Sequence, residues 1–175
     1  MKRVLIFCLI LLTSQTFAQN KQNADFVKYI NEYKDIAIKQ MREHRIPASI
    51  TLAQGLLESG AGNSELARRS NNHFGIKCGS SWKGKTVKHD DDRRNECFRV
   101  YKSVEESYKD HSLFLQKPRY QSLFKLDPLD YKSWARGLKA CGYATNPVYA
   151  NRLIDIIETY ELYMLDEDRH GLTRR

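Results

Sequence analysis

The feature that most constrains this chain is an interruption in its helical patterning. Apolar residues at helical spacing run up to Ser70, give way to a stretch containing several glycines, and resume at Ser103. Inside the interruption, short runs of β-prone residues predict a small antiparallel sheet or hairpin. Its expected strands are 73–78, 85–89 and 96–101. Helices on both sides of one small β element predict an α+β fold, mainly α, with a helical lobe and a small antiparallel β-lobe at about 71–101.

Capping residues place the helices on either side of this β element. Pro47 occupies what we expect to be the first helical position of a helix over 48–59, which Gly60 ends. Its expected buried face carries Ile50, Ala53 and Leu57. The pair Asn146-Pro147 predicts the start of the last helix. Further helices are expected over 23–44 and 64–69, after Ser103 in a capping box, and after Asp130.

The first residues are typical of an export signal. Lys2 and Arg3 precede an apolar run over 4–12, and small residues lead to Ala18. We therefore expect a signal peptide over 1–19 and an exported protein, either periplasmic or extracellular. The apolar run is too short to span a bilayer as a stable helix. No second long apolar stretch follows, so no stable membrane insertion is expected after cleavage.

Charge narrows the class of partner. The chain has 29 Lys and Arg against 21 Asp and Glu, a net charge of +8 that falls to about +6 once the signal is removed. Export argues against nucleic acid as the partner and leaves an anionic envelope polymer. Pairs such as Arg68-Arg69 and Arg93-Arg94 read either as solvated faces or as attraction to wall carboxylates and phosphates. The segment 166–175 is expected to be a charged, frayed tail, and the protein a monomer.

Three cysteines remain once Cys8 leaves with the signal. An oxidising compartment allows one disulfide and one leftover thiol. Cys78 and Cys97 flank a strand-like segment and are the favoured pair, although the sequence leaves open whether they are bridged. Cys141 then reads as a small buried hydrophobe. The histidines show no metal-ligand spacing, so no metal and no cofactor are expected.

Glu58 is the residue with the strongest chemical signal. It lies near the end of the helix over 48–59, on one stripe with Thr51 and Gln54. A carboxylate at a helix C-terminus faces the negative end of the helix dipole, which raises its pKa. A general acid needs this because it must hold its proton near neutral pH. From position alone, the sequence favours a solvated glutamate on a polar stripe.

Four ordered motifs bear a resemblance to one family. The segment 46–64, which contains Ala-Gln-Gly-Leu-Leu-Glu-Ser, closely resembles the catalytic segment of bacterial cell-wall N-acetylglucosaminidases. This is the glucosaminidase-domain family of flagellar and autolysin peptidoglycan hydrolases. Asn71 to Lys77, Phe98 to Tyr101 and Gly142 to Ala150 resemble the family's β-lobe entry, sheet exit and late tyrosine motif. The resemblance covers about 25–163.

The resemblance implies a lysozyme-like helical lobe, a small β-lobe and a groove between them, within a catalytic domain over 20–165. Family members hydrolyse the β-1,4 bond after N-acetylglucosamine in peptidoglycan, and Glu58 matches their general acid. Tyr149 also suits core packing, and Trp82 suits either groove or core. Tyr143 and Tyr149 match groove residues of the family that hold or stack on sugar. The further expected substrate-binding residues are Gln54, Asn72, Phe74 and Trp82.

The second carboxylate departs from the family pattern. Family members often carry Thr-x-Glu on the β-lobe, whereas this chain has an aspartate run that ends at Asp92. Alignment from Trp82 puts the carboxylate nearest Asp92, with Asp91 a close alternative and a plain charged turn a third. Inverting, retaining and substrate-assisted routes all stay open at this point.

Two other functions fit the same motifs. A lytic transglycosylase or muramidase would share Glu58 but cleave after N-acetylmuramic acid. A non-catalytic module that binds glycan would keep the groove, although the presence of Glu58 argues against it.

Overall fold

The computed structural model describes residues 22–91 and 93–170. The predicted signal peptide over 1–19 lies outside these residues. Among the helices that are described, none combines the length and apolar character needed to cross a bilayer.

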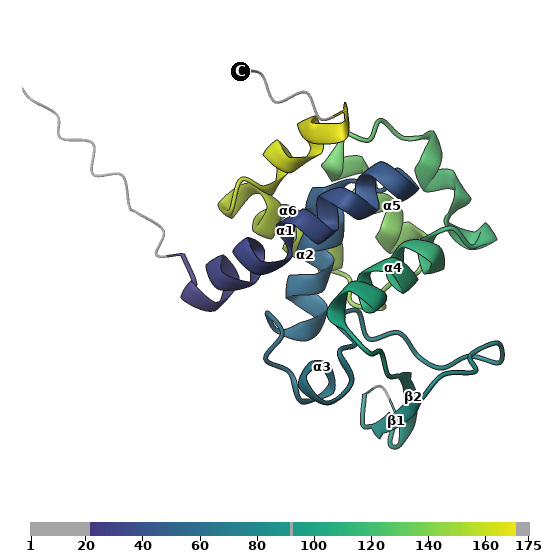
Figure 1. Cartoon of the computed structure of the whole chain (residues 1–175). Coiled ribbons are helices and arrows are strands. Elements are labelled where there is room, and N and C mark those ends of the chain that lie inside the picture. The colour runs from purple at the N-terminus through teal and green to yellow at the C-terminus, as the bar shows by residue number, and fades with distance from the viewer. Residues whose placement is uncertain (1–21, 92, 171–175) are drawn as a thin grey trace, which may run out of the picture.

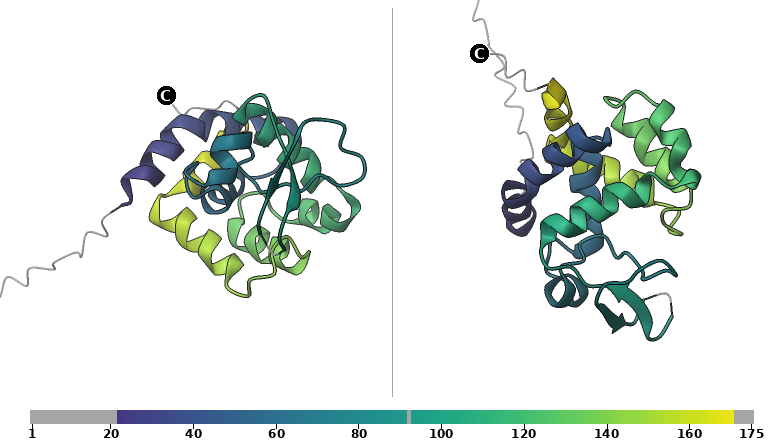
Figure 2. Two further views of the ribbon diagram at one scale, coloured as in Figure 1. Left: turned by 90° about the horizontal axis from the view of Figure 1, so that it is seen from below. Right: turned by 45° about the vertical axis from the view of Figure 1, so that its right-hand side comes forward.

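The predicted α+β fold, mainly α, is confirmed. Figures 1 and 2 show the helices gathered in one lobe and the two strands at one end of it, next to α3. The 3-10 helices η1 and η2 were not predicted as separate elements. In chain order the elements are α1 (Ala24–His44), α2 (Ala48–Ser59), α3 (Glu65–Ser70), β1 (Thr86–His89), β2 (Glu96–Arg99), α4 (Val104–Leu115), η1 (Pro118–Lys125), α5 (Tyr131–Ala140), α6 (Tyr149–Thr159) and η2 (Leu162–His170).

Helix α2 forms the centre of the core. Every one of its residues is buried except Leu57 and Glu58, which are partly exposed in its last turn. We expected one buried face that included Leu57, whereas the helix is buried on all sides and Leu57 is partly exposed. α2 packs against α1, α6 and η2. Within the described part of the chain, it reaches solvent at the end that carries Glu58.

The N-terminus of α2 is capped from far along the chain. Pro47 precedes the helix as its N-cap and makes no side-chain cap, so it is not the first helical residue. Instead, the buried Asp166 accepts hydrogen bonds from the Ser49 backbone N–H at 2.9 Å and from the Ser49 hydroxyl at 2.5 Å. The interpretation of Asp166 as part of a frayed tail is corrected, because η2 holds this carboxylate inside the core.

The β-lobe contains two strands instead of three. β1 and β2 pair antiparallel with Lys88 opposite Cys97, while the expected strand 73–78 contributes only an isolated bridge from Lys77 to Phe98. The Asn72 side chain explains the difference. Its amide oxygen accepts a hydrogen bond from the Ile76 N–H and its NH2 group donates to the Arg99 carbonyl, both at 3.0 Å. A side chain therefore occupies the two groups that the next ladder hydrogen bond would join.

The cysteines divide as favoured, with one correction. Cys78 and Cys97 form a disulfide, which ties the loop before β1 to β2. Cys141 is a free thiol, but it is half-buried and lies 3.6 Å from the Ser122 hydroxyl, so it is not the fully buried residue that was expected.

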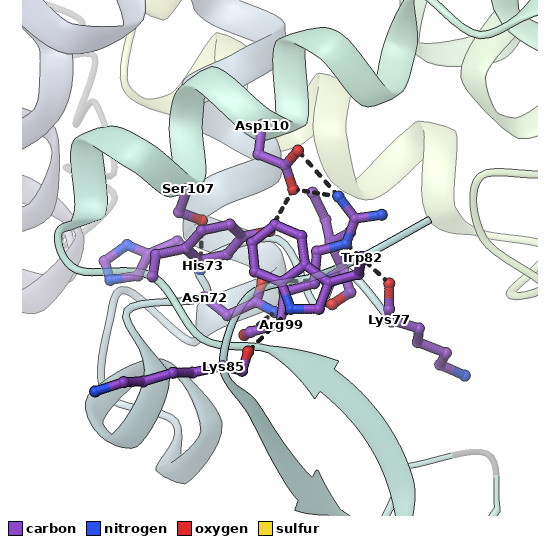
Figure 3. A network of polar contacts seen from close by, with 10 residues as sticks. Asn72, His73, Lys77, Trp82, Lys85, Arg99, Ser107 and Asp110 are labelled. Carbon is purple, nitrogen blue, oxygen red and sulfur yellow. Dashed lines mark hydrogen bonds and ion pairs between the residues drawn. The ribbon is translucent and has the colours of Figure 1, made fainter. Parts of the chain in front are cut away.

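A polar cluster fastens the β-lobe to α4. Figure 3 shows the Arg99 guanidinium between Asp110 of α4 and the Lys77 carbonyl, and its two hydrogen bonds to Asp110 measure 3.0 and 2.8 Å. The Tyr101 hydroxyl donates to the same carboxylate at 2.6 Å. The Trp82 ring covers the guanidinium, whose carbon lies 4.8 Å from the ring centroid. These contacts hold the β-lobe against α4 of the helical lobe.

Candidate active site

A pocket of about 430 Å³ opens between the end of α2, the β-lobe and the start of α6. Glu58 lies on its helical side and Asp91 on its β-lobe side. Tyr143 and Tyr149 line it from the segment that leads into α6. The pocket therefore brings together four of the residues that the sequence analysis singled out.

Burial controls the ionisation of Glu58. The pKa of this carboxyl is raised to about 7, chiefly because burial removes water from around it, and the Asp91 carboxylate contributes to the rise. A hydrogen bond from Tyr149 and the positive charge of Arg152 act in the opposite direction. A carboxyl with this pKa keeps its proton in a large fraction of molecules at neutral pH, as a general acid must.

The Tyr149 hydroxyl links Glu58 to the protein interior. Tyr149 is 4% exposed, and its hydroxyl accepts a hydrogen bond from Gln54 Nε2 at 2.9 Å. It interacts with the Glu58 carboxylate on its other side. The ring of Tyr149 packs in the core, as one interpretation expected, and the residue also lines the pocket. Its contact with sugar stays a prediction.

Asp91 is the described member of the aspartate run that faces the pocket. Its carboxylate is exposed and lies 3.3 Å from Lys77 Nζ, which also contacts Glu96. Asp92, the other candidate for the second carboxylate, lies outside the described residues. The structure therefore places Asp91 opposite Glu58 and makes no comparison between the two aspartates.

Several predicted binding residues lie behind the pocket wall. Asn72 and Phe74 are buried and do not line the pocket: Asn72 holds the Ile76 backbone, and the Phe74 ring stacks on His111 at a centroid distance of 4.0 Å. Gln54 is fully buried and reaches the pocket only through Tyr149. Trp82 belongs to the cluster around Arg99. These placements give the four residues supporting positions instead of direct contact with a ligand in this pocket.

Three basic residues of the pocket were not among the predicted site residues. Lys77 and His89 come from the β-lobe, and Arg152 comes from the first turn of α6. The signals were local ones: His89 lies two residues before Asp91, and Arg152 lies three after Tyr149 on one helical face. No group of three or more His, Cys, Asp or Glu side chains able to hold a metal ion occurs within the described part of the chain.

Residues 34–162 match the family described as Glucosaminidase, mannosyl-glycoprotein endo-beta-N-acetylglucosaminidase. The chain belongs to this glucosaminidase family. The resemblance seen in the sequence motifs is thereby confirmed, and the pocket at the end of α2 is the candidate active site of a glucosaminidase domain.

Curated relatives agree with this membership. The glucosaminidase domain is 39% identical over 138 residues to the exo-glucosaminidase LytG of Bacillus subtilis, a match that covers 71% of this chain and 47% of LytG. It is 32% identical over 161 residues to the peptidoglycan hydrolase FlgJ of Vibrio parahaemolyticus, covering 85% of this chain and 51% of FlgJ. The chain thus spans about half the length of these relatives.

Solved structures share the fold. A peptidoglycan hydrolase from Sphingomonas sp. A1 matches with a TM-score of 0.69 and 31% identity, covering 85% of this chain and 97% of that one. The glycoside hydrolase domain of FlgJ from Salmonella typhimurium matches with a TM-score of 0.67 and 28% identity, covering 83% and 94%. The matches cover nearly the whole of both solved chains, and they include the helical lobe and the β-lobe of this one.

Proposed function

We propose that this glucosaminidase domain hydrolyses peptidoglycan as an endo-β-N-acetylglucosaminidase, cleaving the β-1,4 bond after N-acetylglucosamine with Glu58 as the general acid. One observation carries the proposal. Glu58 combines a pKa raised to about 7 by burial with an open position in a pocket large enough for sugar. The family membership and the peptidoglycan hydrolases among the relatives support the choice of substrate.

In the proposed reaction, Glu58 donates its proton to the glycosidic oxygen as the bond to the anomeric carbon breaks. The positive charge that develops on the sugar is stabilised by the Asp91 carboxylate across the pocket. Asp91 then either positions the attacking water or leaves the first attack to the substrate's own N-acetyl oxygen, after which water opens the cyclic intermediate at the anomeric carbon. The Tyr143 ring stacks on Tyr149 at a centroid distance of 5.8 Å and offers an apolar surface for a pyranose ring.

Product analysis tests the function directly. Purified protein should release muropeptides with a reducing N-acetylglucosamine end, which mass spectrometry identifies. Glu58→Gln should stay folded and lose this activity, while Glu43→Gln, a change at an exposed glutamate outside the pocket, should keep it. Full activity of Glu58→Gln would remove Glu58 from the mechanism, and anhydro-muramic ends would assign a lytic transglycosylase instead.

The β-lobe carboxylate needs its own variants. We expect Asp91→Asn to lower kcat with little change in KM, because the residue faces developing charge and not the bound ground state. Asp92→Asn, the same change at the neighbouring aspartate, is the comparison variant. A loss confined to Asp92→Asn would move the role to that residue.

An exo mode is the second candidate, because one relative is described as an exo-glucosaminidase. Endo cleavage shortens long glycan strands early in the reaction, whereas exo cleavage releases small products from the first minutes. Size-exclusion analysis of strands stripped of their peptides distinguishes the two.

We further propose that the protein is exported by the signal peptide over 1–19 and acts on the wall as a monomer. Cell fractionation with N-terminal sequencing tests the export and the cleavage after residue 18 or 19. Light scattering of the purified protein tests the monomer.

A further inference from the structure

A line of buried polar side chains runs behind Glu58 and joins three helices. His111 of α4 places its Nε2 atom 3.1 Å from the Gln54 Oε1 atom of α2. Gln54 Nε2 in turn donates to the Tyr149 hydroxyl of α6 at 2.9 Å. Both His111 and Gln54 are 0% exposed, so no bulk water competes for these hydrogen bonds.

The first link of this line has a defined direction. Burial lowers the pKa of His111 to about 3, so its ring is neutral and carries one N–H. Its Nδ1 atom has no hydrogen-bond partner among the described residues. Because a buried N–H without an acceptor is rarely tolerated, we place the hydrogen on Nε2, from where it is donated to Gln54.

The donor-to-acceptor direction of this hydrogen bond determines the direction of the next ones, up to Glu58. With its oxygen held by His111, the Gln54 amide turns its NH2 group toward Tyr149. The Tyr149 oxygen is then an acceptor, which leaves its single hydrogen for the Glu58 carboxylate. When Glu58 gives up its proton it becomes an anion, and a hydrogen bond to an anion is stronger than one to the neutral acid.

We propose that Gln54 and His111 are positioning residues, which act through Tyr149 by directing its hydroxyl hydrogen at the Glu58 carboxylate. This inference rests on the proposed role of Glu58. It assigns a function to the buried polar stripe on α2 and to a histidine that does not reach the pocket.

Other groups also act on Glu58. Asp91 faces it from the β-lobe, and Arg152 from the first turn of α6. Tyr143 lies near it in the segment before α6, and Lys77 and His89 lie across the pocket. The His111 ring also meets the Tyr143 ring edge-on at a centroid distance of 6.1 Å. Substitution of Gln54 leaves the other groups in place, so a change in the titration of Glu58 in Gln54→Met is attributable to Tyr149.

The test removes the hydrogen bonds while preserving side-chain volume. Gln54→Met and His111→Met delete the polar atoms. His111→Gln serves as the conservative variant, because its amide nitrogen can replace Nε2 as the donor. We expect both Met variants to lower kcat roughly tenfold with KM nearly unchanged, and to move the basic limb of kcat/KM upward by about one pH unit. His111→Gln should keep the wild-type profile.

A direct titration separates this inference from the proposed function. The 13C chemical shift of the Glu58 carboxyl, followed against pH in the labelled full chain, reports its pKa without any need for activity. We expect a higher pKa in Gln54→Met and in Tyr149→Phe, and no further rise in the double variant, because both changes remove the same hydrogen bond.

Two outcomes overturn the inference. One is an unchanged pKa of Glu58 in folded Gln54→Met. The other is a Glu58 pKa in the double variant that is raised by the sum of the rises in Gln54→Met and Tyr149→Phe. If His111→Met does not fold, the Gln54→Met and Tyr149→Phe pair decides alone. An active Glu58→Gln variant would instead refute the proposed function and leave the titration result standing.

Discussion

Replacing the candidate acid should make the protein more stable, in a way that depends on pH. Glu58 has a pKa of about 7 in the folded protein against a reference value of 4.5. The folded state therefore binds this proton more tightly than the unfolded state does. The free energy of unfolding must fall as pH rises from about 4.5 to 7, and must stay at the lower level above pH 7. Glu58→Gln removes the titration and should remove this loss.

The size of the gain follows from the shift. A difference of about 2.5 units between the two states corresponds to about 3.4 kcal/mol when Glu58 is fully ionised. The side chain is partly exposed to water in the pocket, which screens part of this cost. We therefore expect Glu58→Gln to raise the free energy of unfolding by about 1–3 kcal/mol at pH 8, and by almost nothing at pH 4.

Denaturant unfolding at pH 4, 6 and 8 measures this difference. The control is Glu43→Gln, an exposed glutamate for which no comparable gain is expected. A Glu58→Gln variant that is no more stable than the wild type at pH 8 would refute the burial argument. An equal gain at pH 4 and pH 8 would show that the effect is one of packing and not of ionisation.

Three further predictions concern stability. Asp166→Ala should lower the free energy of unfolding by about 1–3 kcal/mol, because the N-terminus of α2 loses its buried acceptor. The control Glu167→Ala, at an exposed neighbour, should change the free energy of unfolding little. Thermal melts compare the two variants. Gly55→Ala should cost about 1–3 kcal/mol despite the better helix propensity of alanine, because a Cβ there would lie 2.6 Å from a buried tyrosine hydroxyl; an unchanged melting temperature would contradict the contact. Reduction of the Cys78–Cys97 disulfide should abolish activity at denaturant concentrations where far-UV circular dichroism still reports intact helices.

Helices with local capping signals were predictable from the sequence. Asn23, Ser64, Ser103 and Asp130 each accept a backbone N–H from the first turn of the helix that follows. Such signals lie within a few residues of the helix and need no tertiary information. The α2 helix shows the limit, because its cap comes from Asp166, 117 positions away. No local pattern reveals such a partner.

The candidate site was predictable in part for the same reason. Glu58 stood out through its place in α2, and the tyrosine motif led to Tyr143 and Tyr149. The expected cause of the raised Glu58 pKa was the helix dipole, whereas the largest cause is burial, which only the assembled lobes produce. Asn72 and Phe74 share a short motif with the pocket wall, but their side chains face its back. In a loop without regular structure, residue spacing does not tell which side chains face the pocket and which face the core.

α2 and the β-lobe differ in how many amino-acid substitutions each can tolerate. The α2 helix combines the centre of the core with the candidate acid, so nearly every substitution along it is expected to affect folding and catalysis together. The β-lobe loop that carries Asp91 is mostly exposed and is tied at its base by a disulfide and the Arg99–Asp110 pair. Saturation libraries should therefore tolerate far more diversity over 80–91 than over 48–59. New substrate preferences are thus more accessible through the β-lobe than through the helix that holds the acid.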